Sequence, residues 1–86
     1  MWEVQMLARA KKALGKLDRK TAQRVRDGLT RLAAMEDPTA PCKALRGPRA
    51  GLWRYRVGDY RVILDIRRNE VVIVALDLGH RSDIYD

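Results

Sequence analysis

The sequence has few of the residues on which metal and thiol chemistry depend. Its 86 residues include one cysteine, Cys42, and one histidine, His80, which lie far apart along the chain. A single cysteine cannot form an internal disulfide, and one histidine with one cysteine cannot supply a zinc site. The sequence therefore predicts a domain that is stabilised by packing, holds no metal or other cofactor, and suits a reducing cytoplasm.

Long apolar runs and phosphate-binding glycine motifs are missing too. The longest apolar run, residues 71–76, is too short to cross a bilayer, and no basic segment followed by an apolar stretch begins the chain. Gly47 and Gly51 are not followed by Lys-Ser or Lys-Thr before a helix, so nucleotide hydrolysis is not expected. We expect a cytoplasmic protein without a membrane partner.

Positive charge is what the chain has in excess. It carries 18 lysines and arginines against 11 acidic residues, a net charge of +7. Such an excess on a small domain predicts attraction to polyanions, either nucleic acid or an acidic protein. Because the charges are spread along the whole chain, they identify neither the ligand nor the face that binds it.

The order of periodic segments predicts one α+β domain over residues 1–86. Residues 2–6 alternate as a strand does, and helical spacing follows from Ala8 and again after Asp18, a suitable N-cap. Residues 37–51 are predicted to form a long loop, and three strands follow it. The predicted architecture is β-α-α-β-β-β: two N-terminal helices on one face of a four-stranded, mainly antiparallel sheet whose other face is open.

The second helix has two features that depend on its surroundings. Asp27 and Arg31 stand four residues apart, the spacing of a favourable ion pair on a helix. Gly28 in mid-helix costs about 1 kcal/mol relative to alanine. Either another backbone approaches it closely or the helix tolerates it, and both interpretations stay open.

Residues 52–67 have the pattern of a β-hairpin. Two β-rich runs flank a Gly-Asp break at 58–59, where glycine accepts the positive φ of a two-residue turn. Counting outward from the turn places Arg56 opposite Arg61, and Arg54 on the same face. We call this the arginine face; Asp65 is the one acidic residue near it. Like charges directly opposite one another are destabilising unless an anion lies between them, which favours phosphate binding.

The C-terminal residues offer groups that RNA cleavage needs beside cations. Attack by the 2′-hydroxyl of RNA requires a base, an acid and stabilisation of the pentavalent phosphate, but no metal. Histidine is the residue type that titrates near neutrality, so His80 suits proton transfer, although taken alone it is more typical of a hydrogen-bonded turn residue at a strand end. Tyr85 either stacks on a base or packs the end of the chain.

The turn at Arg68-Asn69 decides which of these residues joins the arginine face. A two-residue turn would place His80 there, and a three-residue turn would place Arg81 there. Both alternatives remain open at the level of sequence.

Two motifs and one shorter segment resemble a known family. They are Leu52-Trp53-Arg54-Tyr55-Arg56-Val57-Gly58-Asp59-Tyr60-Arg61-Val62, the ending Gly79-His80-Arg81-Ser82-Asp83-Ile84-Tyr85, and Lys43-Ala44-Leu45-Arg46-Gly47. Together they resemble the RelE branch of the RelE/ParE toxin superfamily, over essentially the whole chain. The resemblance implies the toxin of a type II toxin–antitoxin system, a RelE-like mRNA interferase.

Such an endoribonuclease enters the ribosome, cleaves mRNA through 2′-hydroxyl attack without a metal, and so inhibits translation. The partners that the resemblance implies are the ribosome with its mRNA and an acidic, RelB-like antitoxin, which forms a hetero-oligomer with the toxin.

The resemblance also implies roles for single residues. The predicted catalytic residues are Arg54, Arg56, Arg61, His80 and Arg81, and the predicted RNA-binding residues are Lys43, Arg46 and Tyr85. In relatives the pair matching Arg54 and Arg56 is often lysine, one of which is proposed as the base. Arginine is too weak an acid for that role, so these two are expected to clamp phosphate, and His80 is expected to carry the proton.

Two other functions stay as alternatives. A ParE-like poison of DNA gyrase would produce DNA breaks and leave mRNA intact. A non-catalytic module that binds nucleic acid or an antitoxin would be harmless when overproduced.

Overall fold

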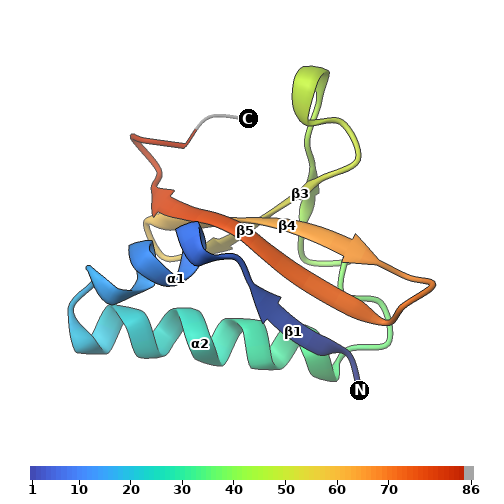
Figure 1. Cartoon of the computed structure of the whole chain (residues 1–86), viewed down its shortest axis with the longest axis horizontal. Coiled ribbons are helices and arrows are strands. Elements are labelled where there is room, and N and C mark those ends of the chain that lie inside the picture. Colours follow the sequence, from blue (N-terminus) through green and yellow to red (C-terminus); the bar gives the residue numbers. More distant parts are fainter. Residues whose placement is uncertain (85–86) are drawn as a thin grey trace.

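The structure, a computed structural model, describes residues 1–84 and has two layers, with both helices on one face of a single sheet (Figure 1). The elements in chain order are β1 (Glu3–Met6), α1 (Ala8–Gly15), α2 (Arg19–Ala34), β2 (Lys43–Ala44), the 3₁₀ helix η1 (Gly47–Arg49), β3 (Trp53–Val57), β4 (Tyr60–Arg67) and β5 (Val72–His80). Within residues 1–84, neither helix combines the length and apolar composition that a membrane-spanning segment needs. Tyr85, for which base stacking was predicted, lies outside the described residues.

The α+β class and the helix pair are confirmed, but the sheet has five strands rather than the predicted four, in the order β1-β5-β4-β3-β2. The additional strand, β2, pairs Lys43 with Arg54 and Ala44 with Trp53 inside the segment predicted to be loop. Two residues are too few to show a strand period, so the sequence could not mark it. β1 runs parallel to β5, and the other pairs are antiparallel.

The helices and the sheet share one apolar core. The Asp18 carboxylate accepts a hydrogen bond from the Thr21 backbone N–H at 3.1 Å, which confirms the predicted N-cap of α2. The fully buried apolar residues from both layers include Val25, Leu32, Val62, Leu64 and Ile73. Each such side chain stabilises the fold by about 1.5–3 kcal/mol, so this interface is the main source of stability.

The hairpin has the predicted register. Val57 pairs with Tyr60, and Arg56 lies opposite Arg61. Gly58 has a φ of 58°, as the two-residue turn requires.

The β4–β5 pair departs from both predicted turns. Arg67 pairs with Val72, so the connection has four residues, 68–71. A β-bulge follows: Leu64 pairs with Ala75 but Ile63 pairs with Asp77, which leaves Leu76 as an extra residue. An extra residue exchanges the faces of all positions after it. His80 therefore pairs with Tyr60, on the helix-covered face.

Gly28 is explained by a side chain rather than by a second backbone. A β-carbon at this position would lie 2.9 Å from Cε2 and 3.2 Å from Oη of Tyr55, and 3.3 Å from Cγ2 of Val57. The tyrosine ring of β3 packs directly on the backbone of α2. Glycine thus sets the distance between helix and sheet at this point.

We expect Gly28→Ala to destabilise the protein although it raises helix propensity. Overpacking costs about 1–3 kcal/mol, which outweighs the gain of about 1 kcal/mol in propensity. Urea unfolding followed by circular dichroism measures the difference. Gly15→Ala is the control, because a β-carbon at Gly15 would meet no atom within 4 Å beyond its chain neighbours and the backbone of its own helix. A Gly28→Ala variant as stable as wild type would contradict the account.

A polar cluster fastens the segment after α2 to the β4–β5 connection. The Asp37 carboxylate accepts hydrogen bonds from the hydroxyl and N–H of Thr39 at 2.6 and 3.1 Å. Arg68 donates to Asp37 and to the Thr39 hydroxyl, at 3.1 Å each. These contacts, with the Thr39 hydroxyl as the largest cause, lower the pKa of Asp37 below its ordinary 3.8. The cluster joins parts of the chain that are distant in sequence.

The lowered pKa of Asp37 predicts a stabilisation that depends on pH. It is fully present above the unfolded-state value near 3.8 and is lost as pH falls through the lower folded-state value. We therefore expect Asp37→Asn to lower the melting temperature at pH 7, with a difference from wild type that shrinks below about pH 3.8. Calorimetry across this range tests it, with Glu36→Gln as the control. A difference that stays constant down to pH 2.5 would contradict the pairing.

Candidate functional site

Four cations from three neighbouring strands lie on the sheet face that the helices leave uncovered. Lys43 of β2 pairs with Arg54 of β3, and Arg56 of β3 pairs with Arg61 of β4. Cross-strand partners share a face, so the predicted RNA-binding Lys43 joins the arginine face. Asp65 does not offset this charge directly, because its carboxylate binds Arg67 at 2.8 Å.

The sequence predicted that this face is open. In the structure it carries a second, small apolar cluster. Leu45, Ile63 and Ile84 are buried in it, and Leu52 and Leu76 pack against them. Leu76 is the extra residue of the bulge, and the other partners of Ile63 come from outside the sheet. The cations thus border an apolar floor, where the lower effective dielectric strengthens their interaction with an anion.

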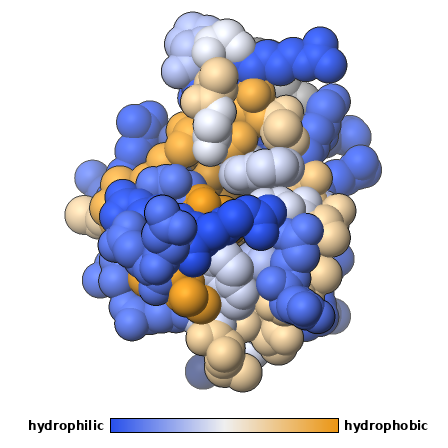
Figure 2. Space-filling view, turned by 90° about the vertical axis from the view of Figure 1, so that its right-hand side faces the viewer, coloured by the Kyte–Doolittle hydropathy of each residue, from blue (hydrophilic) through white to orange (hydrophobic). Residues whose placement is uncertain are grey.

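One wall of the site is a projecting segment, residues 45–52, which we call the arm (Figure 1). Its base is closed by a hydrogen bond from the Leu45 N–H to the Leu52 carbonyl at 3.0 Å. Gly47 and Gly51 have φ values of 63° and 94°, which let the chain reverse. Figure 2 shows hydrophilic side chains at the tip of the arm and apolar surface beneath it. The predicted RNA-binding Arg46 is exposed on this arm.

The other wall is the tail, residues 81–84, which folds back over the end of β5. The Arg81 N–H donates to the Asp59 carbonyl at 2.8 Å, and the N–H groups of Asp83 and Ile84 donate to the His80 carbonyl. Ile84 is only 5% exposed, and its carbonyl accepts a hydrogen bond from Nη1 of Arg61 at 3.3 Å. The tail therefore reaches the arginine face, although the Arg81 side chain is exposed.

His80 lies on the other face. Its ring meets the ring of Tyr60 edge to face, with centroids 5.5 Å apart. Its Nδ1 is 2.8 Å from the Ser82 hydroxyl and accepts the Ser82 N–H at 3.2 Å. These contacts hold the turn that directs the tail toward Arg61. The proton-transfer role of His80 stays a prediction, and its contacts favour positioning of the tail.

Cys42 is not a candidate nucleophile. Burial, together with the charge of Asp37, raises the pKa of its thiol to about 11, so the thiolate is scarce at neutral pH. Its sulfur lies 3.3 Å from the Pro38 carbonyl oxygen. Among residues 1–84, no three His, Cys, Asp or Glu side chains gather closely enough to hold a metal ion.

The residues that shape the site without carrying charge were not predicted from the sequence. Ile84 holds the tail on the arginine face, and Leu45 holds the base of the arm. The only signal for Ile84 was an apolar residue within an otherwise polar ending. Gly79, in the last strand, is the surface on which Ile84 packs.

Comparison with known proteins gives a match over nearly the whole chain. The family model described as the ParE toxin of the type II toxin–antitoxin system parDE matches residues 4–85. A search of curated proteins finds no significant match.

Solved structures of toxins are similar in fold and length. In the toxin–antitoxin complex RelBE2 from Mycobacterium tuberculosis, a chain is 27% identical, with a TM-score of 0.85 over 95% of this chain and 93% of that one. In the archaeal RelE–RelB complex from Pyrococcus horikoshii the identity is 28% and the TM-score 0.78, over 96% and 98%. The YoeB/ParE toxin from Agrobacterium tumefaciens, 16% identical with a TM-score of 0.74 over 91% and 96%, shares the fold.

The packing of the tail predicts the effect of Gly79→Ala. A β-carbon at Gly79 would lie 2.9 Å from Cδ1 and Cγ1 of Ile84, so alanine should displace the tail. We expect amide hydrogen exchange of Ile84 to accelerate by about tenfold or more, since overpacking costs about 1–3 kcal/mol. Global stability should change less, because the tail can open locally. Exchange at the wild-type rate in Gly79→Ala would disprove the contact.

Proposed function

We propose, since this chain belongs to the ParE toxin family of type II toxin–antitoxin systems, that it is an endoribonuclease that cuts ribosome-bound mRNA and inhibits translation. The observation that carries the proposal is the pair Arg56 and Arg61, placed directly opposite one another with Arg54 and Lys43 on the same face. Four cations on one face match the charge of a phosphodiester in its transition state better than that of a neutral ligand.

RNA suits this face because the substrate supplies its own nucleophile. When the 2′-hydroxyl attacks the adjacent phosphorus, the P–O5′ bond breaks, and negative charge builds up on the nonbridging oxygens. Guanidinium groups stay charged throughout and donate two parallel hydrogen bonds to phosphate oxygens. Arg61 is held for this role by its hydrogen bond to the Ile84 carbonyl.

The proposed substrate path runs between the arm and the tail. Arg46 on the arm and Lys43 at its base would bind the RNA backbone on one side of the arginine face. Arg81, beside the Gly58-Asp59 turn, would approach the leaving oxygen from the other side, and Tyr85 would stack on a base. In this proposal the tail is part of the site, so its docking and the cleavage rate are linked.

The net charge of +7 also favours an acidic protein partner. The similar chains from M. tuberculosis and P. horikoshii were solved in complexes with antitoxins. We propose that an acidic, RelB-like antitoxin likewise holds this protein in an inactive hetero-oligomer in the cytoplasm.

A second candidate function is poisoning of DNA gyrase. It is favoured by the family model itself, which describes ParE toxins. It requires no RNA cleavage, so the two functions give opposite results for mRNA and for DNA integrity.

The arginine face predicts the outcome of an mRNA cleavage assay. We expect the wild-type protein to cut a message within codons only while the message is translated, as mapped by primer extension. Arg61→Ala should slow cleavage by about 10²–10³-fold, the usual cost of removing one group that stabilises an oxyanion. Arg56→Ala, on an exposed side chain, should also slow it, whereas Arg19→Ala on α2 is the control. Intact mRNA together with broken DNA would refute the proposal in favour of gyrase poisoning.

Two variants of His80 in the same assay separate positioning from proton transfer. Asparagine can accept the Ser82 N–H as Nδ1 does, but it cannot titrate near neutrality. If His80 only positions the tail, His80→Asn keeps cleavage within about tenfold of wild type while His80→Ala loses more. If His80 carries the proton, both variants lose cleavage, and the part of the pH–rate profile that it controls disappears.

A further inference from the structure

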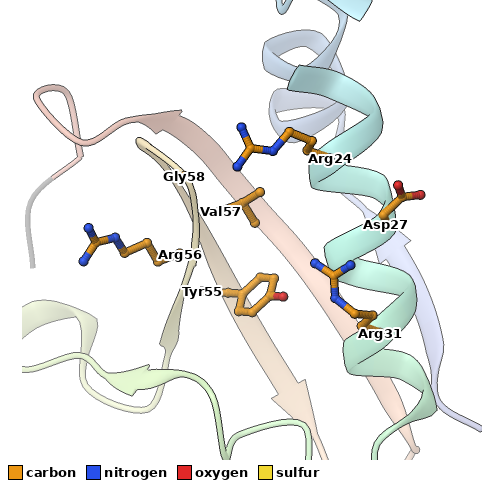
Figure 3. A pocket seen from close by; sticks show the side chains of 7 residues that line it. All are labelled: Arg24, Asp27, Arg31, Tyr55, Arg56, Val57 and Gly58. Atoms are coloured by element: carbon orange, nitrogen blue, oxygen red, sulfur yellow. The ribbon is translucent and has the colours of Figure 1, made fainter. Parts of the chain in front are cut away.

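A second group of arginines lines a cleft between α2 and β3, on the helix-covered side of the sheet. The cleft has a volume of about 260 Å³ and is lined by Arg24, Asp27, Arg31, Tyr55, Arg56, Val57 and Gly58 (Figure 3). Neither Arg24 nor Arg31 is among the site residues predicted from the sequence.

The two helix arginines point toward the strand rather than away from the protein. They stand seven residues, or two turns, apart on α2, so they share one side of the helix. Figure 3 shows both guanidinium groups reaching from α2 toward β3. Arg24 reaches the hairpin turn, because its Nη2 would be 3.3 Å from a β-carbon on Gly58.

These arginines are not neutralised by the acidic residue between them. The predicted Asp27–Arg31 ion pair does not form; Asp27 instead accepts a hydrogen bond from Gln23 Nε2 at 2.9 Å. Within the part of the chain that the structure describes, no carboxylate lies within ion-pair distance of Arg24 or Arg31, although Arg67 and other surface arginines have such partners. The cleft therefore concentrates positive charge.

The cleft and the arginine face lie on opposite faces of the sheet, on either side of strand β3. β2 pairs only with Trp53 and Arg54, so the rest of β3 forms the outer edge. Tyr55 and Val57 face α2, while Arg56 points away from it toward the arginine face (Figure 3). A single extended strand of backbone separates the two sets of cations.

We propose that this cleft is a second phosphate-binding site, which holds the backbone of single-stranded RNA as it passes from the arginine face over the edge of β3. Arginine forks fit phosphate oxygens, and cations on both sides of one strand fit a flexible chain with a charge at every residue. Its apolar lining is limited to Val57 and the Tyr55 ring, too little for the apolar centre of a protein interface. The choice of RNA as ligand rests on the proposed function.

Salt-dependent binding of an RNA that cannot be cut tests this site separately from cleavage. The probe is a fluorescent single-stranded 12-nucleotide uridine oligomer with 2′-O-methyl groups, which blocks 2′-hydroxyl attack. We expect Arg24→Ala/Arg31→Ala to reduce the slope of log K against log salt by about 1.4, since each phosphate contact on a single strand contributes about 0.7. Fluorescence anisotropy from 50 to 300 mM salt measures the slope.

The matched control is Arg19→Ala/Arg26→Ala, which removes two exposed arginines of the same helix with the same seven-residue spacing. It should change the slope by less than half as much. If both double variants change the slope equally, only the net charge of the protein matters and the proposed site is overturned. The site is also overturned if neither variant changes the slope.

Two further probes identify the ligand class. If Arg24→Ala/Arg31→Ala weakens binding of a hairpin duplex but not of the single strand, the single-strand proposal is overturned. If the double variant loses binding of polyglutamate but keeps binding of the RNA oligomer, the cleft is a site for an acidic protein instead. Because the oligomer is not cleaved, a protein that fails to cut mRNA can still show the slope change. Failure of the proposed function and failure of the cleft therefore remain distinguishable.

Discussion

The alternation of side chains along β4 is the constraint on which the rest of the structure depends. This strand lies inside the sheet, between β3 and β5, and both of its faces are covered. Val62 and Leu64 point into the core with the helices, whereas Arg61 and Ile63 point to the opposite face. A slip of one residue would bury Arg61 beneath α2 and expose the core. Stability and the position of the arginine face are therefore set by the same register.

Two side chains pack directly on glycines, and these contacts position α2 and the tail on the sheet. At Gly28 the absence of a side chain lets Tyr55 pack on α2, and at Gly79 it lets Ile84 pack on β5. The first brings the helix close enough to the edge strand for its arginines to line a cleft with Tyr55 and Val57. The second brings the tail to Arg61. In both cases a small residue within a regular element determines where charged groups meet, so substitution of an uncharged residue should alter the charged surfaces.

The positions of the arginines in the fold, rather than their number, determine where positive charge gathers. Arg67 and Arg68 have carboxylate partners, and the pair of Arg68 with Asp37 joins two surface segments. Arg54, Arg56 and Arg61 lie on one side of the β3 edge, and Arg24 and Arg31 lie on the other. Local spacing predicted the first group, because a two-residue turn specifies which residues oppose one another. It did not predict the second group, since a helix that packs on a sheet brings together residues about thirty positions apart, and no short-range pattern records that contact.

By itself the sequence determined the class of the fold, the capped second helix, the hairpin register and the three arginines of the arginine face, because each follows from local periodicity or from a turn with a strict geometry. Only the tertiary structure decided the face of His80, the two-residue strand β2, the docking of Ile84 and the failure of Asp27 to pair with Arg31. A bulge of one residue reverses every face beyond it, and β2 and Ile84 depend on neighbours that only the folded chain brings together. Asp27 binds Gln23 on its own helix, while Arg31 turns toward β3.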